Sequence, residues 1–338
     1  SITTTRTLLH ESIPLTGAIV SGTYSDNNIK NYTHGQFQSI YDYPFLSSSA
    51  NHIFDLTVGY DESSSLSSSA ATQNAKKINM YNQFSQVLLG FTGSSNTVRK
   101  FELDLSLDEA GEIMRESLFF NFSRLITKDQ IKKGSFSMIL GTGSWANPFL
   151  STSTLSDSDA SDTGGTTNTF GGDYGVLKDS EGVARGVVFY QAGIVCLSTS
   201  SWDPAVVGDF YSSSYSAGTG LGGTKKIDEV LTGSSIVVAC DAIRRRLRNI
   251  SFNNTTEINS SIYFCRVPHN KYNHSSNPTY LSSSTIRVKS VNTDTPVAYI
   301  TTVGLYSADN ELMAMAKLSE PLKKDPSNEI TLRVRLDY

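Results

Sequence analysis

The chain has 338 residues, a formal net charge of −4, 38% hydrophobic residues and 18% charged residues. It contains 50 Ser and 32 Thr, so small hydroxyls rather than charges make its surface polar. The near-neutral charge argues against the basic surface of a nucleic-acid-binding protein. No stretch reaches the ~18 uninterrupted apolar residues that a membrane span needs. We therefore expect partners other than nucleic acids and membranes.

The aromatic content predicts an ordered core, because 16 Phe and 16 Tyr are spread along a chain of low charge. At this length a single core is near its practical limit of about 250–300 residues, so we expect two domains. Ser, Thr and Gly dominate 151–172, which favours a loop or linker there. The expected organisation is an α+β domain at 1–150, a linker at 151–172 and an antiparallel β domain at 173–338.

The opening residues lack the charged and apolar segments of a secretory signal, so we expect a protein that is made and used without secretion. Cys196, Cys240 and Cys265 are odd in number, far apart and each set in an apolar stretch. This pattern is typical of free, buried thiols in a reducing compartment.

Helical periodicity is clearest after Thr72, where apolar side chains recur until Gly90 provides a helix stop. A second, shorter helix is expected over 107–115. A single turn is expected over 128–133, with Thr127 as its N-cap.

Most of the remaining chain has the pattern of strands. Alternating apolar and polar residues predict strands at 286–289 and 330–337, and continuous apolar runs predict strands at 187–197, 235–243 and 260–267. Two further strands, 299–306 and 311–318, flank a turn-like tetrad and predict a hairpin. The expected fold is mainly β (α+β): antiparallel, sandwich-like layers with a few short helices and long Ser/Gly-rich loops.

Three motifs have possible ligand chemistry, and a structural role is favoured for each. The glycines of 218–223 match a dinucleotide-binding fingerprint but follow no buried strand, so a flexible loop is preferred. Asp157, Asp159 and Asp162 are spaced like calcium ligands, yet the Gly and Glu of a calcium loop are missing. His269 and His274 have a zinc-like spacing without a Cys pair. We therefore expect no metal and no cofactor.

Arg244, Arg245, Arg246 and Arg248 form the strongest run of charge in the sequence. Arginine side chains suit carboxylates and phosphates, so one interpretation is a contact with an acidic partner surface. The alternative is a solvated edge. No residue is nominated as catalytic, since no nucleophile, base or phosphate-binding motif is present in its required context.

Three blocks of the sequence have a pattern that is found in a known family. The C-terminal block joins 298–306, with Val303-Gly304-Leu305-Tyr306, to 309–324 and the closing strand 330–338. The other two blocks are 121–136 and 264–280. These blocks resemble virion structural proteins of tailed bacteriophages, in particular the contractile-tailed phages of marine hosts. The resemblance covers about a third of the chain, although Met313, Met315 and His274 depart from the expected residues.

The resemblance implies a non-enzymatic baseplate or tail component that acts through protein–protein interfaces and is assembled into the virion in the host cytoplasm. Its implied partners are other virion proteins, with a homo-oligomer as a further option. Low charge with abundant aromatics suits such interfaces. The alternative is a receptor- or carbohydrate-binding β protein with Trp145 or Trp202 as a stacking platform. An envelope-degrading hydrolase is the least favoured reading.

Overall fold

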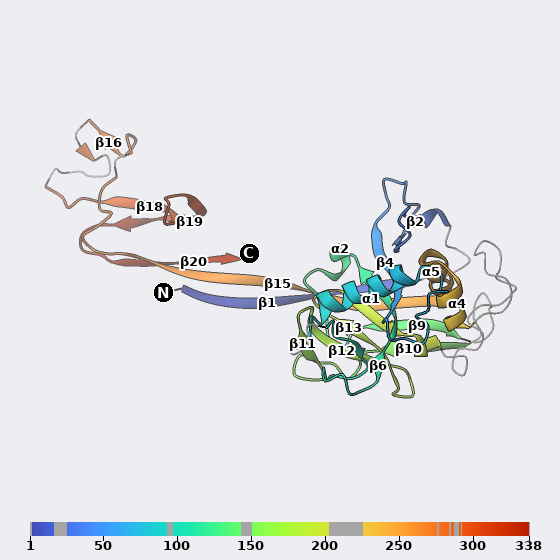
Figure 1. Cartoon of the computed structure of the whole chain (residues 1–338). Coiled ribbons are helices and arrows are strands. Elements are labelled where there is room, and N and C mark those ends of the chain that lie inside the picture. Colours follow the sequence, from blue (N-terminus) through green and yellow to red (C-terminus); the bar gives the residue numbers. More distant parts are fainter. Residues whose placement is uncertain are drawn as a thin grey trace. The chain divides into compact units, whose positions relative to one another are not determined.

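The fold is mainly β with antiparallel strand pairing, as the sequence predicts (Figure 1). The chain divides into two compact units: a large unit of 9–256 and a small unit of 1–8 with 257–338. Two long strands, β1 (Ile2–Thr16) and β15 (Leu247–Val267), contribute residues to both units. This computed structural model describes residues 2–16, 26–92, 97–142, 151–202, 226–275, 277–283, 285–286, 291 and 293–337.

The sheet of the large unit is one antiparallel series. From β15 its order is β9 (Ser137–Thr142), β10 (Ser151–Ser156), β12 (Gly172–Lys178), β13 (Ala184–Phe189), β14 (Ile194–Ser198), β7 (Glu116–Phe122), β4 (His52–Tyr60), β3 (Gln38–Tyr41) and β2 (Ile29–Asn31). The short strands are β8 (Gln130–Ile131) beside β15, β11 (Thr167–Thr169) beside β12, and the pair β5 (Phe101–Glu102) and β6 (Ile113–Met114).

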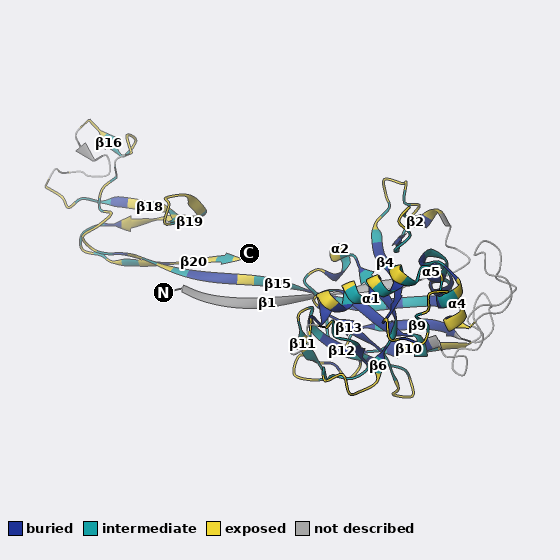
Figure 2. Cartoon of the chain, viewed as in Figure 1, coloured by how far each residue is buried: buried dark blue, intermediate teal, exposed yellow. Residues whose placement is uncertain are grey.

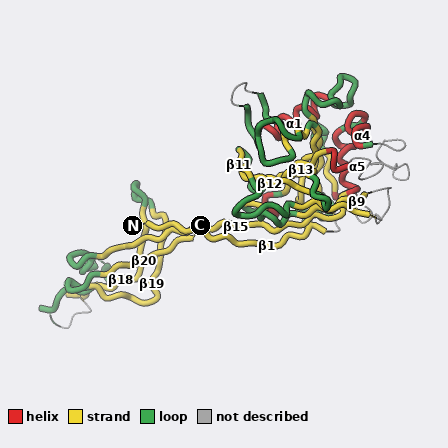
Figure 3. Tube along the Cα trace, turned by 90° about the horizontal axis from the view of Figure 1, so that it is seen from below, coloured by secondary structure: helices red, strands yellow, loops and turns green. Residues whose placement is uncertain are grey.

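The helices of the large unit lie outside these strands, as Figure 3 shows. In the described residues they are α1 (Asn74–Leu88), α2 (Arg124–Thr127), α4 (Ile227–Gly233) and α5 (Ile236–Arg246), with 3₁₀ turns η1 (Asp26–Asn28) and η2 (Thr199–Trp202). The helix predicted between Thr72 and Gly90 is confirmed as α1, and Gly90 has the positive φ of 82° that a helix stop requires. No helix in the described residues is long and apolar enough to cross a membrane.

The centre of the sheet is buried on both faces (Figure 2). In β7, Leu118 and Phe120 belong to one apolar cluster, while Phe119 between them belongs to a second. Helix α5 packs on the first face, where the Cys240 thiol lies 3.3 Å from the carbonyl oxygen of Leu56. Helix α1 packs on the second face. The alternation of a strand therefore produces two cores, one under each helix.

Two of the expected helices are wrong. In 107–115 the carboxylate of Asp108 accepts a hydrogen bond from the backbone N–H of Ala110 at 3.0 Å, and just before this segment Asp104 accepts one from the N–H of Ser106 at 2.9 Å. Such local turns compete with helix formation. In 128–133, Lys128 has a φ of 56° and the following residues pair with β15 as β8; the helical turn α2 comes just before them.

The strand expected at 235–243 is also wrong, because these residues form α5. Ser235 caps the helix by accepting a hydrogen bond from the N–H of Val238 at 3.4 Å. The buried residues Ile236, Ala239, Cys240 and Ile243 follow the helical spacing of three and four. The apolar run at 187–197 forms two strands, β13 and β14, around a turn with Gly193 at φ 67°.

The 151–172 segment lies inside the large unit rather than between two units. Its first part is β10, which pairs along its whole length with β9 from Ser151↔Thr142 to Ser156↔Ser137. Its end forms β11 and the start of β12. Ser and Thr supply small side chains that a strand accepts, so hydroxyl content alone does not mark a linker.

Helix α1 approaches β4 so closely that Gly59 has no room for a side chain. A Cβ atom at Gly59 would lie 2.7 Å from both the carbonyl oxygen of Lys77 and the backbone nitrogen of Tyr81. One turn further along the helix, Phe84 stacks on Phe119, with ring centroids 4.3 Å apart and an interplanar angle of 5°. The spacing between helix and sheet thus depends on a glycine in β4.

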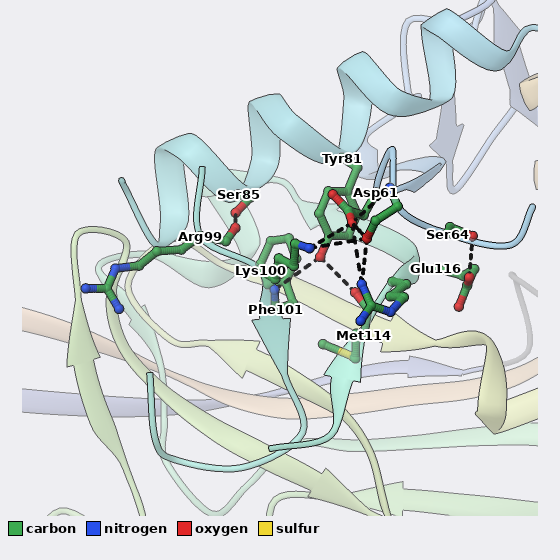
Figure 4. A network of polar contacts seen from close by, with 11 residues as sticks. Asp61, Ser64, Tyr81, Ser85, Arg99, Lys100, Phe101, Met114 and Glu116 are labelled. Carbon is green, nitrogen blue, oxygen red and sulfur yellow. Dashed lines mark hydrogen bonds and ion pairs between the residues drawn. The ribbon is translucent and has the colours of Figure 1, made fainter. Parts of the chain in front are cut away.

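Polar contacts hold α1 over the β5–β6 pair (Figure 4). The Tyr81 hydroxyl donates to the carbonyl of Met114 at 2.7 Å and accepts from the N–H of Phe101 at 3.2 Å. Beside them, the Lys100 ammonium lies 3.2 Å from the carboxylate of Asp61. Burial acts to raise the pKa of Asp61, but hydrogen bonds from Ser63 and Lys100 outweigh it and hold that pKa below its ordinary value.

The first turn of α1 is fastened to α4 by the buried ammonium group of Lys77. This group donates to the carbonyls of Thr72 and Ser234, both at 2.7 Å, and to that of Leu231. Burial lowers the pKa of Lys77 to about 8. The carbonyls at the end of α4 supply the partial negative charge that a cation at a helix C-terminus requires.

We predict that Gly59→Ala destabilises the protein by about 1–3 kcal/mol, because the added methyl group meets backbone atoms that have no room to move. Urea denaturation measures the change in the free energy of unfolding. Gly164→Ala is the matched control, since a Cβ there meets nothing within 4 Å, and its effect is expected within ~0.5 kcal/mol. Equal effects of the two substitutions would contradict the close approach of α1 to β4.

Candidate interaction surface

The small unit contains the predicted C-terminal strand, which is confirmed as β20 (Ile330–Asp337). It pairs with β15 from Ser260↔Asp337 to Val267↔Ile330. The register places Val267, Leu332 and Val334 on one face, and all three are buried. This is the small apolar core of the unit.

The predicted hairpin is also confirmed, as β18 (Ala298–Tyr306) and β19 (Leu312–Lys324). Its turn is closed by a hydrogen bond from the N–H of Ser307 to the carbonyl of Glu311 at 2.9 Å, and Asn310 has a φ of 64°. In the described residues these two strands form a sheet of their own. A second, very short hairpin pairs β16 (Leu281–Ser282) with β17 (Thr285–Ile286), and 287–289 of the expected strand 286–289 lie outside the described residues.

The hairpin is exposed although it is rich in apolar residues. Within β18 and β19 only Ala298 and Lys324 are buried. Six large apolar side chains are exposed, with fractions from 36% to 70%: Tyr299, Tyr306, Leu312, Met313, Met315 and Leu322. Scattered single exposed apolar residues are normal, but a group of this kind on one element makes it a candidate interaction surface.

Three of these side chains form a continuous patch. Gly304 pairs with Met315, and after an irregularity in the register Tyr306 pairs with Leu312. A Cβ atom at Gly304 would lie 3.4 Å from Leu312, so Leu312 lies on the same face as Gly304 and its partner Met315. A Cβ atom at Gly304 would lie 2.9 Å from the Tyr306 ring, because the ring covers the glycine. We call Tyr306, Leu312 and Met315 the hairpin patch. Their exposed fractions are 64%, 53% and 57%.

A groove of about 430 Å³ lies in the small unit beside β18. Its walls come from β15, β20, β18 and the loop around Tyr272. Tyr272 and Tyr299 line it with exposed fractions of 67% and 48%. The groove therefore offers aromatic faces next to polar backbone.

The two histidines with zinc-like spacing lie in a loop that polar and ring contacts hold in place. The buried Lys324 ammonium donates to the carbonyl of His269 at 3.2 Å and to the side chain of Asn273 at 2.6 Å, which fixes this loop against the end of β19. The His274 ring instead packs edge-on against Tyr280 at 5.8 Å. Within the described residues, no group of three His, Cys, Asp or Glu side chains is placed to hold a metal ion.

The four arginines do not form one exposed surface. Arg244 and Arg246 are buried in the last turn of α5, whereas Arg245 and Arg248 are half-buried. Arg246 donates to the carbonyl of Gly141 at 3.0 Å, and Arg244 forms an ion pair with Asp241 at 2.8 Å. Cations at a helix C-terminus are favoured by its dipole, which accounts for their position. Arg244 and Arg246 are thus engaged inside the fold, and the contact with an acidic partner stays a prediction for the half-buried Arg245 and Arg248.

The aspartates spaced like calcium ligands have separate roles. Buried Asp157 accepts hydrogen bonds from the N–H groups of Gly134 and Phe136, both at 2.8 Å, and from the Tyr190 hydroxyl at 3.0 Å. Burial raises the pKa of Asp157, while these hydrogen bonds act in the opposite direction. Asp159 pairs with Lys178 at 2.6 Å. Asp157 is therefore a structural acceptor for the turn that precedes β9.

Other features of the sequence have mixed outcomes. Cys196 and Cys240 are buried and free as predicted, but Cys265 is only half-buried. The glycine-rich 218–223 and Trp145 lie outside the described residues, as does the side chain of Trp202.

Comparisons of the chain with protein-family models, curated proteins and solved structures find no match.

The sequence predicts the hairpin but not the exposure of its patch. Residues 312–316 are apolar at consecutive positions, a pattern that usually indicates a strand buried on both faces. In the described structure nothing covers the hairpin patch. This mismatch between apolar pattern and exposure is the signal that identifies the surface.

We predict that Asp157→Asn lowers the free energy of unfolding by about 1–3 kcal/mol, because the amide nitrogen faces donors that need an acceptor. Chemical denaturation measures this change. Asp159→Asn, which removes only an exposed ion pair, is expected to cost at most about 1 kcal/mol. Calcium added to the wild-type chain is expected to leave its melting temperature unchanged, and a clear rise would restore the calcium interpretation.

Proposed function

We propose that this chain is a non-enzymatic structural component of a bacteriophage virion, a tail or baseplate protein that acts through protein–protein interfaces. The observation that carries the proposal is the exposed hairpin patch on an element made largely of apolar residues. Interface cores favour aromatic residues and Met and contain few charges. Tyr306, Leu312 and Met315 have this composition.

The stability of the hairpin supports the same conclusion. A two-stranded sheet in water is marginally stable unless another layer covers one of its faces. Val303, Leu305 and Ala316 of the opposite face are themselves only half-buried. A partner protein placed on the hairpin patch would supply the missing layer.

The assignment to a virion rests on sequence resemblance. The hairpin and β20 coincide with the C-terminal block that resembles tail proteins, and His274 and Tyr280 belong to another of these blocks. The proposal therefore combines a family resemblance with a surface that a structural component needs. The neighbours in the particle are, on this proposal, other virion proteins.

The alternative function, binding of a carbohydrate receptor, is favoured by one specific observation. Tyr272 and Tyr299 are exposed at the rim of the groove beside β18, where sugar rings could stack on aromatic faces. Binding of the purified chain to a glycan array, lost in Tyr272→Ala and Tyr299→Ala, would favour this function. Absence of binding would leave the structural function as the better account.

The virion proposal predicts that the chain is a constituent of purified particles. Mass spectrometry of gradient-purified phage should detect it, and antibodies against the chain should label the tail in electron micrographs. A chain that stays in the lysate and is absent from infectious particles would refute the proposal.

The hairpin patch predicts which variants fail to assemble. Combined Tyr306→Ser, Leu312→Ser and Met315→Ser should lower incorporation into particles at least tenfold, while circular dichroism of the chain remains unchanged because these side chains are exposed. Leu46→Ser with Leu125→Ser is the control, since these residues are 87% and 80% exposed in the large unit. Normal incorporation of the triple variant would exclude the hairpin patch as the interface.

A further inference from the structure

A cavity of about 270 Å³ lies in the large unit between α1 and the sheet. Its walls are mostly apolar, with Phe37 from the loop before β3, Phe84 and Val87 from α1, and Ile194 from β14. Four polar side chains interrupt this lining: Asp55, Thr57, Gln83 and Asn121. Small-molecule sites commonly have this character, with an apolar wall and few convergent polar groups.

Strand register explains why the polar groups come together. Asp55 in β4 pairs with Ser39 on one side and Asn121 on the other, and Asn121 pairs with Ile194. Directly paired residues of antiparallel strands lie on the same face, so Ser39, Asp55 and Asn121 form a polar row across three strands. The next row, Thr57 and Phe119, lies under Phe84. The polar row therefore lines the sheet side of the cavity, next to the apolar row on which Phe84 of α1 packs.

The carboxylate of Asp55 is held in place through only one of its two oxygen atoms. Its Oδ1 accepts a hydrogen bond from the Ser39 hydroxyl at 2.5 Å and lies 2.9 Å from Nε2 of His52. Within the described residues, Oδ2 has no hydrogen-bond or ion-pair partner, and the side chain retains 26% exposure. Lys30, the next residue of the row, places its ammonium group 4.9 Å from the Tyr32 ring centroid instead.

We propose that this pocket binds a guanidinium, amidinium or ammonium group on a short apolar stem. The stem would pack between Phe84, Val87 and Ile194, and the cation would pair with Oδ2 of Asp55. The last turn of α1 contains no basic residue, so the negative end of the helix dipole adds to the attraction. An arginine or lysine side chain of a partner protein has this chemistry, and so does a free organic cation.

The test uses the full chain and the matched probes benzamidine and benzamide, which have the same shape but differ in charge. Ligand-observed NMR should detect benzamidine binding, and amide signals of Asn121 and Ile194 should shift. Benzamide should bind at least tenfold more weakly. Raising the salt concentration should weaken benzamidine binding, because part of the attraction is electrostatic. Absence of benzamidine binding, or equal binding of both probes, overturns the proposal.

Asp55→Asn should lower benzamidine affinity at least tenfold. Asp42→Asn is the control: it removes the same charge near the end of β3, outside the pocket, where Asp42 accepts hydrogen bonds from Asn51 at 2.6 and 2.8 Å. It should leave affinity unchanged. Equal affinity of Asp55→Asn and wild type overturns the proposal, and the comparison of the two probes on wild-type protein remains decisive if Asp55→Asn fails to fold.

A second pair of probes identifies the source of the cation. N-acetyl-arginine N-methylamide represents a protein side chain, and agmatine represents a free cation with the same guanidinium. Tighter binding of the first assigns the pocket to a partner protein, and tighter binding of the second assigns it to a free metabolite. Failure of both to bind overturns the proposal. None of these results depends on whether the chain is found in a virion.

Discussion

The distance between α1 and β4 is the constraint on which the large unit depends. Gly59 allows the helix backbone to lie against the strand, with the carbonyl of Lys77 and the amide of Tyr81 where a side chain would otherwise be. The position of Tyr81 over Met114 and Phe101 follows from this approach. The same close approach positions Phe84 over Phe119 and determines how far α1 covers the sheet. A pocket opens at that end because α1 extends beyond the apolar row onto the polar one.

The two units use their apolar residues differently. In the large unit, strands such as β7 are buried on both faces, and even a charged group such as Lys77 is enclosed and fully engaged. In the small unit, the hairpin exposes apolar residues on one face and half-exposes them on the other. Since burial of apolar area is the main stabilising contribution in folding, the hairpin alone gains little of it. Its sequence suits a strand pair that is completed by contact with another molecule.

The sequence correctly predicts those strands and helices in which the spacing of apolar residues fits only one kind of secondary structure. The strand at 330–337 alternates strictly, the hairpin has a clear turn, and α1 ends at a glycine. Where one pattern of apolar residues suits both a strand and a helix, the sequence predicts the wrong element. The run Ile236 to Ile243 is β-branched enough for a strand, yet its apolar residues also follow helical spacing, and the Ser235 cap decides for a helix. The burial of Arg244 and Arg246 follows from the same helix end, which a strand does not have.

Both candidate sites depend on features that a single strand pattern does not show. The pocket requires the register that sets Asp55 between Ser39 and Asn121, three residues far apart in the sequence. The apolar residues of the hairpin patch can be read from the sequence, but only the structure shows that no described part of the chain covers them. The low fraction of charged residues in the chain also bears on how partners would be recognised. Arg185 of the large unit is paired inside the fold, with Asp179 at 2.9 Å, and on the proposed function the exposed apolar surface carries recognition. On that proposal, partners are distinguished by shape rather than by a broad electrostatic field.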